Sequence, residues 1–169
     1  MGRRLGRAVV TAFAVGLACL PLSGCTVPVR GVTGISVAAD GTPVVMIVVC
    51  KGGRIDSSVL HEPEDTKAPH IAWEHDGPVK DFTSWPLAGD GHWRLTTPLV
   101  DLRPGTAYRV YGATHDNKWS AGAVEFSLED LAAMTPDQVR YRGAVTPGEF
   151  GVTSVAEFRK TACHEKDRS

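Results

Sequence analysis

The chain has 169 residues, of which 18 are basic and 19 acidic, and its formal net charge is -1. This length suits one domain, and the near-neutral charge supplies no basic field of the kind that phosphate backbones select, which argues against a nucleic-acid partner. With 43% hydrophobic and 22% charged residues, the composition is that of a folded globular protein and excludes a mainly disordered one.

The first 24 residues have the features of an export signal. Three arginines without an acidic residue precede an apolar run at residues 8–20, which is shorter than the roughly twenty residues that span a bilayer. The sequence Leu-Ser-Gly-Cys follows at residues 22–25 and resembles the lipobox of bacterial lipoproteins. The resemblance implies that Cys25 is acylated and becomes the first residue of the mature chain. An ordinary signal peptide with a chance cysteine is the alternative.

Removal of residues 1–24 takes three of the 18 basic residues and none of the 19 acidic ones, so the mature chain has a net charge of -4. Buried acyl chains contribute about 0.8 kcal/mol per methylene and hold a protein at a membrane without help from its charge. We therefore expect the mature protein at the extracellular face of the cytoplasmic membrane. Cys25 would make the membrane contact through its lipid, and the domain would stay in water.

The remaining cysteines predict a disulfide. Cys19 would leave with the signal and Cys25 would carry lipid, so only Cys50 and Cys163 would remain, in an oxidising compartment where two thiols usually pair. A bond between them would close most of the mature chain into a loop, for which the chain-entropy estimate is roughly 4 to 5 kcal/mol. A buried free Cys50 and a metal-thiolate pair with a histidine are the alternatives.

Beyond a tether at residues 25–31, short apolar runs alternate with turn residues. The runs at 32–39 and 44–50 flank an Asp-Gly-Thr-Pro turn and predict a hairpin, whose second strand should be central because it is apolar on both faces. Further strands are expected at 55–61, 70–75, 79–87, 93–97, 108–114, 122–128 and 138–143, with a helical turn at 129–134. This pattern lacks long helical periodicity and predicts an all-β fold, an antiparallel β-sandwich.

The most informative stretch of the domain lies at residues 101–110. Leu102, Pro104, Gly105 and Tyr108 resemble the corner motif of fibronectin type III and other immunoglobulin-like domains. The resemblance implies that the leucine enters the core, that Pro-Gly turns the chain, and that the tyrosine hydroxyl bonds to backbone near the corner. The whole chain is similar to uncharacterised secreted lipoproteins of actinobacteria, a family label that implies no activity.

The C-terminal part predicts one short helix. After Pro147-Gly148, the sequence Ser-Val-Ala-Glu at residues 154–157 has the pattern of a capping box and opens a helix toward Cys163. So short a helix is marginally stable alone, and the bond to Cys50 would hold it against the β domain. The expected organisation is a signal at 1–24, a tether at 25–31, a β-sandwich domain at 32–143 and a C-terminal extension with the helix at 144–169.

No motif of a catalytic class is present. The chain has no Gly-x-Ser-x-Gly, His-Glu-x-x-His, phosphate loop or Cys-x-x-Cys, so we assign no catalytic residue, metal ligand or cofactor. A metal site would need histidines to converge with carboxylates over long range, and solvated loop histidines are the simpler interpretation. The six histidines are His61, His70, His75, His92, His115 and His164.

The candidate binding residues are His115, Asp116, Lys118 and Trp119. Trp73 and Trp85 lie among alternating apolar residues and are expected in the core, whereas Trp119 falls in a polar hairpin loop, where sandwich domains often recognise partners. A tryptophan folded back onto the sheet is the alternative.

The function expected from the sequence is that of a non-catalytic binding or scaffolding domain at the cell surface. Its partner would be an envelope protein or a cell-wall glycan. The alternative is a metal-binding or enzymatic envelope protein with a site assembled from scattered His and Asp or Glu residues.

Overall fold

The computed structural model describes residues 26–65, 67–68, 70–143 and 149–166. The predicted signal, Cys25 and Pro147-Gly148 lie outside the described residues. Strands and two helices follow one another in this order: β1 (Val29–Val37), β2 (Pro43–Val49), β3 (Ile55–His61), β4 (Ile71–Val79), β5 (Phe82–Pro86), β6 (Trp93–Leu95), β7 (Tyr108–Ala113), β8 (Ser120–Gly122), β9 (Val124–Phe126), α1 (Leu128–Ala132), β10 (Gln138–Arg142), β11 (Phe150–Ser154) and α2 (Val155–Lys166).

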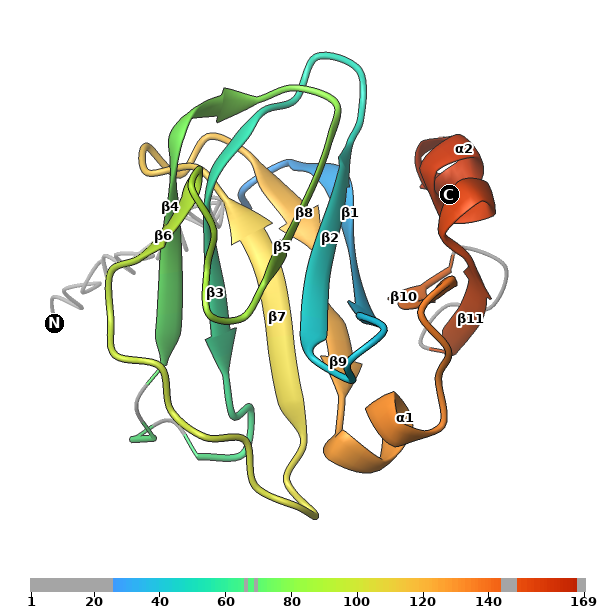
Figure 1. Ribbon diagram of the computed structural model, residues 1–169. Helices are drawn as coiled ribbons and strands as arrows, with labels where there is room; N and C mark the ends of the chain where they lie inside the picture. The colour runs from blue at the N-terminus through green and yellow to red at the C-terminus, as the bar shows by residue number, and fades with distance from the viewer. Residues whose placement is uncertain (1–25, 66, 69, 144–148, 167–169) are drawn as a thin grey trace, which may run out of the picture.

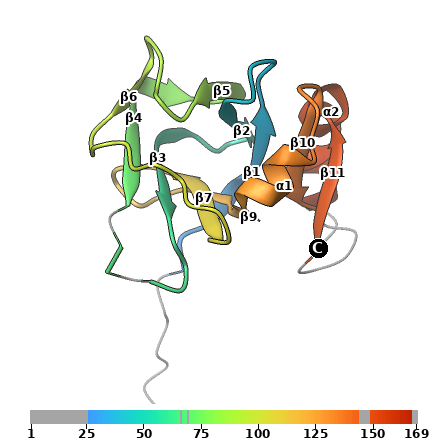
Figure 2. The same cartoon turned by 60° about the horizontal axis from the view of Figure 1, so that its bottom comes forward.

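All of these strands belong to one sheet that curls nearly into a barrel (Figures 1 and 2). β1 lies between β2 on one side and β8 and β10 on the other, and the order continues through β7, β3 and β4 to β6. β5, β9 and β11 pair with β2, β7 and β10. Of these ladders, the one between β1 and β8 is parallel. The chain is therefore mostly β, as predicted, with a short C-terminal helix, but the two separate sheets of a sandwich are not confirmed.

β2 is the central strand that its sequence predicted. It lies between β1 and β5, and its alternate residues face opposite sides, as in any extended strand. Val45, Ile47 and Val49 pack into the barrel interior. Met46 and Val48 belong to a second apolar cluster on the outer face.

Three buried tryptophans fill the barrel next to the gap between β5 and β6. Trp85 and Trp93 stack with their ring centroids 3.9 Å apart, and the Trp73 ring meets Trp85 edge-on. Trp93 Nε1 donates a hydrogen bond to Thr83 Oγ1 at 2.7 Å. Within the described residues no ladder joins β5 to β6. Side-chain contacts therefore close the gap between these two strands, which is called the β5–β6 seam. The prediction that Trp73 and Trp85 are core residues is confirmed.

The second helix covers the outer face of the sheet beside β1, β2 and β10 (Figure 1). Its buried Phe158 packs edge-on against Tyr141. Ser154 Oγ accepts a hydrogen bond from the Glu157 backbone amide at 3.2 Å, which is one of the two hydrogen bonds of the predicted capping box. Neither described helix is long and apolar enough to cross a bilayer.

The predicted disulfide between Cys50 and Cys163 is present. The Cα atoms of the two residues are 5.4 Å apart, which is within the usual range. The bond joins the last part of α2 to the chain directly after β2, and it encloses a sequence separation of 113 residues.

The predicted tyrosine corner also forms. Tyr108 is buried, and its hydroxyl accepts a hydrogen bond from the Arg103 backbone amide at 2.7 Å. Gly105 turns the chain with φ 70°, a left-handed conformation that glycine adopts without strain. Leu102 packs against the barrel core.

Some boundaries differ from those predicted. β1 begins at Val29, inside the segment expected to be a tether. β4 continues through the expected turn at residues 76–78, although its ladder with β6 ends at His75, because Val79 pairs with Ile55 of β3 after a register shift. The strand expected at 122–128 is divided into β8 and β9, and β11 was not predicted at all. Each difference arises where a long-range partner decides the backbone conformation.

Candidate functional site

The predicted binding residues lie at one end of the barrel, uppermost in Figure 1. This end, called the upper end below, is formed by residues 26–30, 50–54, 80–81 and 114–119. The lower end is formed by the β1–β2 turn, the β3–β4 and β6–β7 loops, and α1 (Figure 2). The two ends therefore present different loops, and the β7–β8 loop at residues 114–119 is the candidate site.

Asp116 organises the β7–β8 loop. Its Oδ2 accepts a hydrogen bond from Arg54 Nη2 at 2.6 Å and lies 3.2 Å from Lys118 Nζ. The neighbouring His115 amide donates to Asp56 Oδ1 at 2.9 Å. Asn117 completes the turn with φ 52°. The loop is therefore held against the β2–β3 turn and the start of β3 by contacts between residues far apart in sequence.

The electrostatic environment of Asp116 favours its carboxylate form. The pKa of Asp116 is lowered to about 2, chiefly by the hydrogen bond to the Thr114 side chain and further by the Lys118 amide, the Lys118 ammonium and the Arg54 guanidinium, against an opposing effect of desolvation. Asp116 is thus ionised at neutral pH. Its negative charge lies between two cations.

Trp119 joins this loop to the beginning of β1. Its ring is half-buried, and the Arg30 guanidinium lies over it at 5.8 Å from the centroid. The next residue, Ser120, donates its backbone amide to the Pro28 carbonyl oxygen at 3.0 Å. Trp119 is therefore outside the barrel core, while His115, Asp116 and Lys118 are exposed. The structure brings all four predicted residues together at the upper end.

The histidines show only pairwise contacts with carboxylates. His115 Nε2 lies 3.8 Å from Glu74 Oε1, and His92 Nδ1 lies 4.0 Å from Asp76 Oδ2. Across the part of the chain that the structure describes, no three His, Cys, Asp or Glu side chains are arranged to hold a metal ion. The metal-binding alternative gains no support from these residues.

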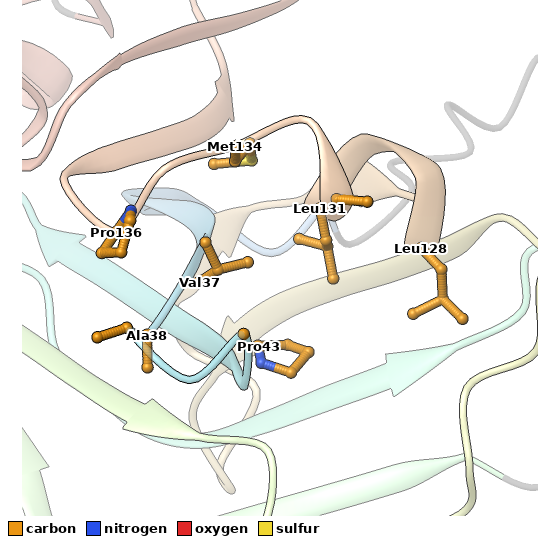
Figure 3. A pocket seen from close by; sticks show the side chains of 10 residues that line it. Val37, Ala38, Pro43, Leu128, Leu131, Met134 and Pro136 are labelled. Atoms are coloured by element: carbon orange, nitrogen blue, oxygen red, sulfur yellow. The ribbon is translucent and has the colours of Figure 1, made fainter.

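An apolar pocket of about 480 Å³ lies at the lower end, between α1 and the β1–β2 turn. Figure 3 shows Leu128, Leu131 and Met134 on one side of it and Val37 and Pro43 on the other. The same three α1-side residues also contact the barrel core, so α1 closes this end. None of the lining residues is titratable, and the pocket offers no acid, base or nucleophile. The sequence did not predict it.

A second pocket, of about 410 Å³, lies beside β3 and β7 near the same end. It contains His61, whose ring meets the edge of Tyr111 with centroids 6.0 Å apart. Burial lowers the pKa of His61, and Arg109 and His70 lower it further. This environment therefore favours the neutral form of the ring. The pairing of β3 with β7 creates this pocket, and no local motif indicates it.

The sequence identified the candidate loop but missed the residues that hold it. Arg30, Arg54 and Asp56 lie on β1, in the β2–β3 turn and on β3, and only the sheet topology brings them to residues 114–119. Arg54 follows a double glycine in the sequence, but nothing in this local pattern indicates a contact with Asp116. No family model, curated protein or solved structure matches this chain.

Proposed function

We propose that the chain is a lipid-anchored lipoprotein whose domain binds or scaffolds at the extracellular face of the cytoplasmic membrane, without catalysis. The observation that carries the proposal is the bond between Cys50 and Cys163, because disulfides persist mainly in oxidising compartments outside the cytoplasm. The bond also uses both cysteines of the domain. Cys25, at the end of the lipobox-like segment, is thereby the cysteine left for acylation in the mature chain.

The binding role rests on the β7–β8 loop. A loop that is already held in one conformation loses less conformational entropy when it binds a partner. The contacts from Arg54 and Asp56 provide such a hold, and they leave His115 and Lys118 exposed. The partner expected for this surface is an envelope protein, a wall glycan or the membrane itself.

The immunoglobulin-like relationship belongs to the same proposal. The hydrogen bond from the Arg103 amide to the Tyr108 hydroxyl supports it, because a corner of this kind is a hallmark of that architecture. In this interpretation the barrel is a sandwich whose two faces have joined along β1, β8 and β7.

The anchoring step is tested on the full chain in a bacterial host that acylates lipoproteins. Wild type and Cys25→Ala are compared by radiolabelled palmitate incorporation and membrane fractionation, with Cys19→Ala as the matched cysteine control. We expect label and membrane recovery for wild type and Cys19→Ala. Cys25→Ala should incorporate no label and should accumulate as a precursor or leave the membrane. An intact mature chain with unmodified Cys25 would contradict the proposal.

A further inference from the structure

The upper end of the barrel presents a lysine on each of three neighbouring connections. Lys51 is in the β2–β3 turn, Lys80 in the β4–β5 turn and Lys118 in the β7–β8 loop, and all three are exposed. Backbone hydrogen bonds join these connections to their neighbours, from the Cys50 amide to the Arg30 carbonyl at 2.8 Å and from the Val49 amide to the Asp81 carbonyl at 2.6 Å. Together with Arg30 and Arg54, the lysines form one cationic rim.

The acidic residues at this end do not neutralise the positive charge of the rim. Asp81 and Asp116 are its exposed acids, and Asp116 is shared by Arg54 and Lys118. Within the described residues, no carboxylate lies within ion-pair distance of Lys51 or Lys80. Two lysines are thus available to an external anion.

The lower end has the opposite charge. Its loops and α1 contain only Lys67 and Arg103 as basic residues, and Arg103 is paired with Glu62. The acidic residues of these loops, of α1 and of its connection to β10 are Asp40, Glu62, Glu64, Asp65, Asp101, Glu129, Asp130 and Asp137. Asp130 is paired with Arg140 of β10. A domain from a mature chain of net negative charge therefore has one cationic end and one anionic end.

The position of the predicted lipid places the cationic end at the membrane. Pro28 is fixed to β8 by the hydrogen bond from the Ser120 amide. Cys25 precedes Pro28 by three residues, and an extended chain spans at most about 3.6 Å per residue. An acylated Cys25 thus lies within about 11 Å of Pro28, which is close to the Debye length of about 8 Å at physiological ionic strength.

Trp119 adds an aromatic side chain to the same surface. It is half-buried, lies under the Arg30 guanidinium and is next to the segment that leads to Cys25. Tryptophan is enriched at membrane interfaces, because its ring is apolar and its N–H is polar. The rim therefore combines cations with an interfacial side chain at the attachment point.

We propose that the upper end binds the anionic phospholipid headgroups of the membrane in which the chain is anchored. The residues that would contact these headgroups are Lys51, Lys80, Lys118, Arg30 and Trp119. The inference rests on the proposed lipid anchor and names the partner of the candidate loop. It gives the barrel a fixed orientation, with the acidic end and its apolar pocket directed away from the bilayer.

The test uses the acylated full chain bound to vesicles of phosphatidylcholine alone or mixed with phosphatidylglycerol. Flotation first reports whether the chain is anchored. Amine acetylation, read by peptide mass spectrometry, then measures the labelling rate of Lys51, Lys80 and Lys118 against Lys67 at the opposite end. We expect the three rim lysines to label several-fold more slowly on the anionic vesicles, with Lys67 unchanged. The protection should disappear in 1 M salt, where the Debye length falls to about 3 Å.

A charge variant completes the test. Lys51→Gln/Lys80→Gln should reduce the protection of Lys118 on anionic vesicles to less than two-fold, whereas the matched control Lys67→Gln should leave it unchanged. Equal labelling of all lysines on floated anionic vesicles would overturn the membrane-facing orientation and leave the anchor standing. A chain that does not float on either vesicle would overturn the anchor itself. Stronger protection of Lys118 by soluble wall-glycan fragments than by anionic lipid would assign the surface to a glycan and overturn the inference.

Discussion

Tyr108 shows how a single side-chain atom stabilises a turn in this barrel. Its hydroxyl accepts the hydrogen bond of the Arg103 amide, so Tyr108→Phe leaves a partly buried amide without a partner. We expect a loss of about 1 kcal/mol, measured as a lower urea midpoint with an unchanged m-value. Tyr111→Phe removes the same atom from a tyrosine whose hydroxyl has no hydrogen bond within the described residues, and it should change the midpoint less. Equal midpoints for wild type and Tyr108→Phe would show that the corner contributes no stability.

Asp116 predicts a pH dependence whose direction follows from its lowered pKa. A carboxyl with a folded-state pKa of about 2 and a higher unfolded value contributes stability above the unfolded pKa and loses it as the pH falls toward 2. The destabilisation caused by Asp116→Asn should therefore be present at pH 6 and should shrink between pH 4 and pH 2. Urea titrations of wild type and variant across this range measure the difference. Asp101→Asn, in an exposed loop, serves as the control, and an Asp116→Asn effect that is independent of pH would contradict the assignment.

Residue-level features were predictable where the chemistry is local in sequence. The corner around Tyr108 lies within residues 103–108 and the Ser154 cap within residues 154–157, and the hydrogen bonds that Tyr108 and Ser154 accept occur in the structure. The Cys50–Cys163 pair was predicted because Cys19 was assigned to the signal peptide and Cys25 to acylation. The partners of Asp116 and Trp119 were not predictable, because they reach the loop from other strands.

The second helix depends on long-range attachment more than on its own sequence. Its buried Phe158 and the bond at Cys163 hold it to the sheet. Reduction of the disulfide should therefore lower the amide protection of residues 155–163 before that of β2, as native-state hydrogen exchange measures. The double variant Cys50→Ser/Cys163→Ser should show the same loss without reductant and no further change with it. If α2 keeps protection equal to that of β2 after reduction, packing by Phe158 alone is sufficient.

Elements were predictable where the apolar pattern is uninterrupted or bounded by turn residues. β2 is a continuous apolar run, and β3, which is flanked by turn residues, has the boundaries expected from its sequence. β11 was missed because most of its side chains are not buried and it is defined by its ladder with β10. The extension of β4 through Gly77-Pro78 was missed for a related reason. Val79, beyond these turn-forming residues, pairs with Ile55 of β3, and this long-range pair continues the strand past them.

Closure of the barrel depends on side chains at the seam between β5 and β6. Trp93 stacks on Trp85 and donates to Thr83 across this seam. Trp93→Ala should cost roughly 3 to 5 kcal/mol, as for other buried aromatic truncations, and should expose the amides of β5 and β6 to exchange. Trp119→Ala removes the same side chain from outside the barrel and should cost less. Equal losses for the two variants would mean that the seam has no special role.

The curvature of the whole molecule could not be predicted from the strand pattern. Alternation along a strand specifies which side chains are buried, but it is the same for an inner face of a sandwich and for the interior of a barrel. The difference here is made by the short β8, which pairs parallel with β1 and antiparallel with β7. A strand of three residues has too weak a pattern to indicate two partners.

The disulfide also determines how the molecule carries mechanical load. Tension between a membrane anchor before β1 and a partner attached beyond Cys163 would pass through the sulfur bridge, so residues 51–162 would lie outside the force path. Only β1 and β2 precede Cys50 in the chain, and they alone would be extended. At about 3.4 Å per residue, this limits the lengthening to about 80 Å. Because β1 and β2 are central strands that supply Ile35, Ile47 and Val49 to the core, this extension would open the barrel, and the sulfur bridge would set its maximum length.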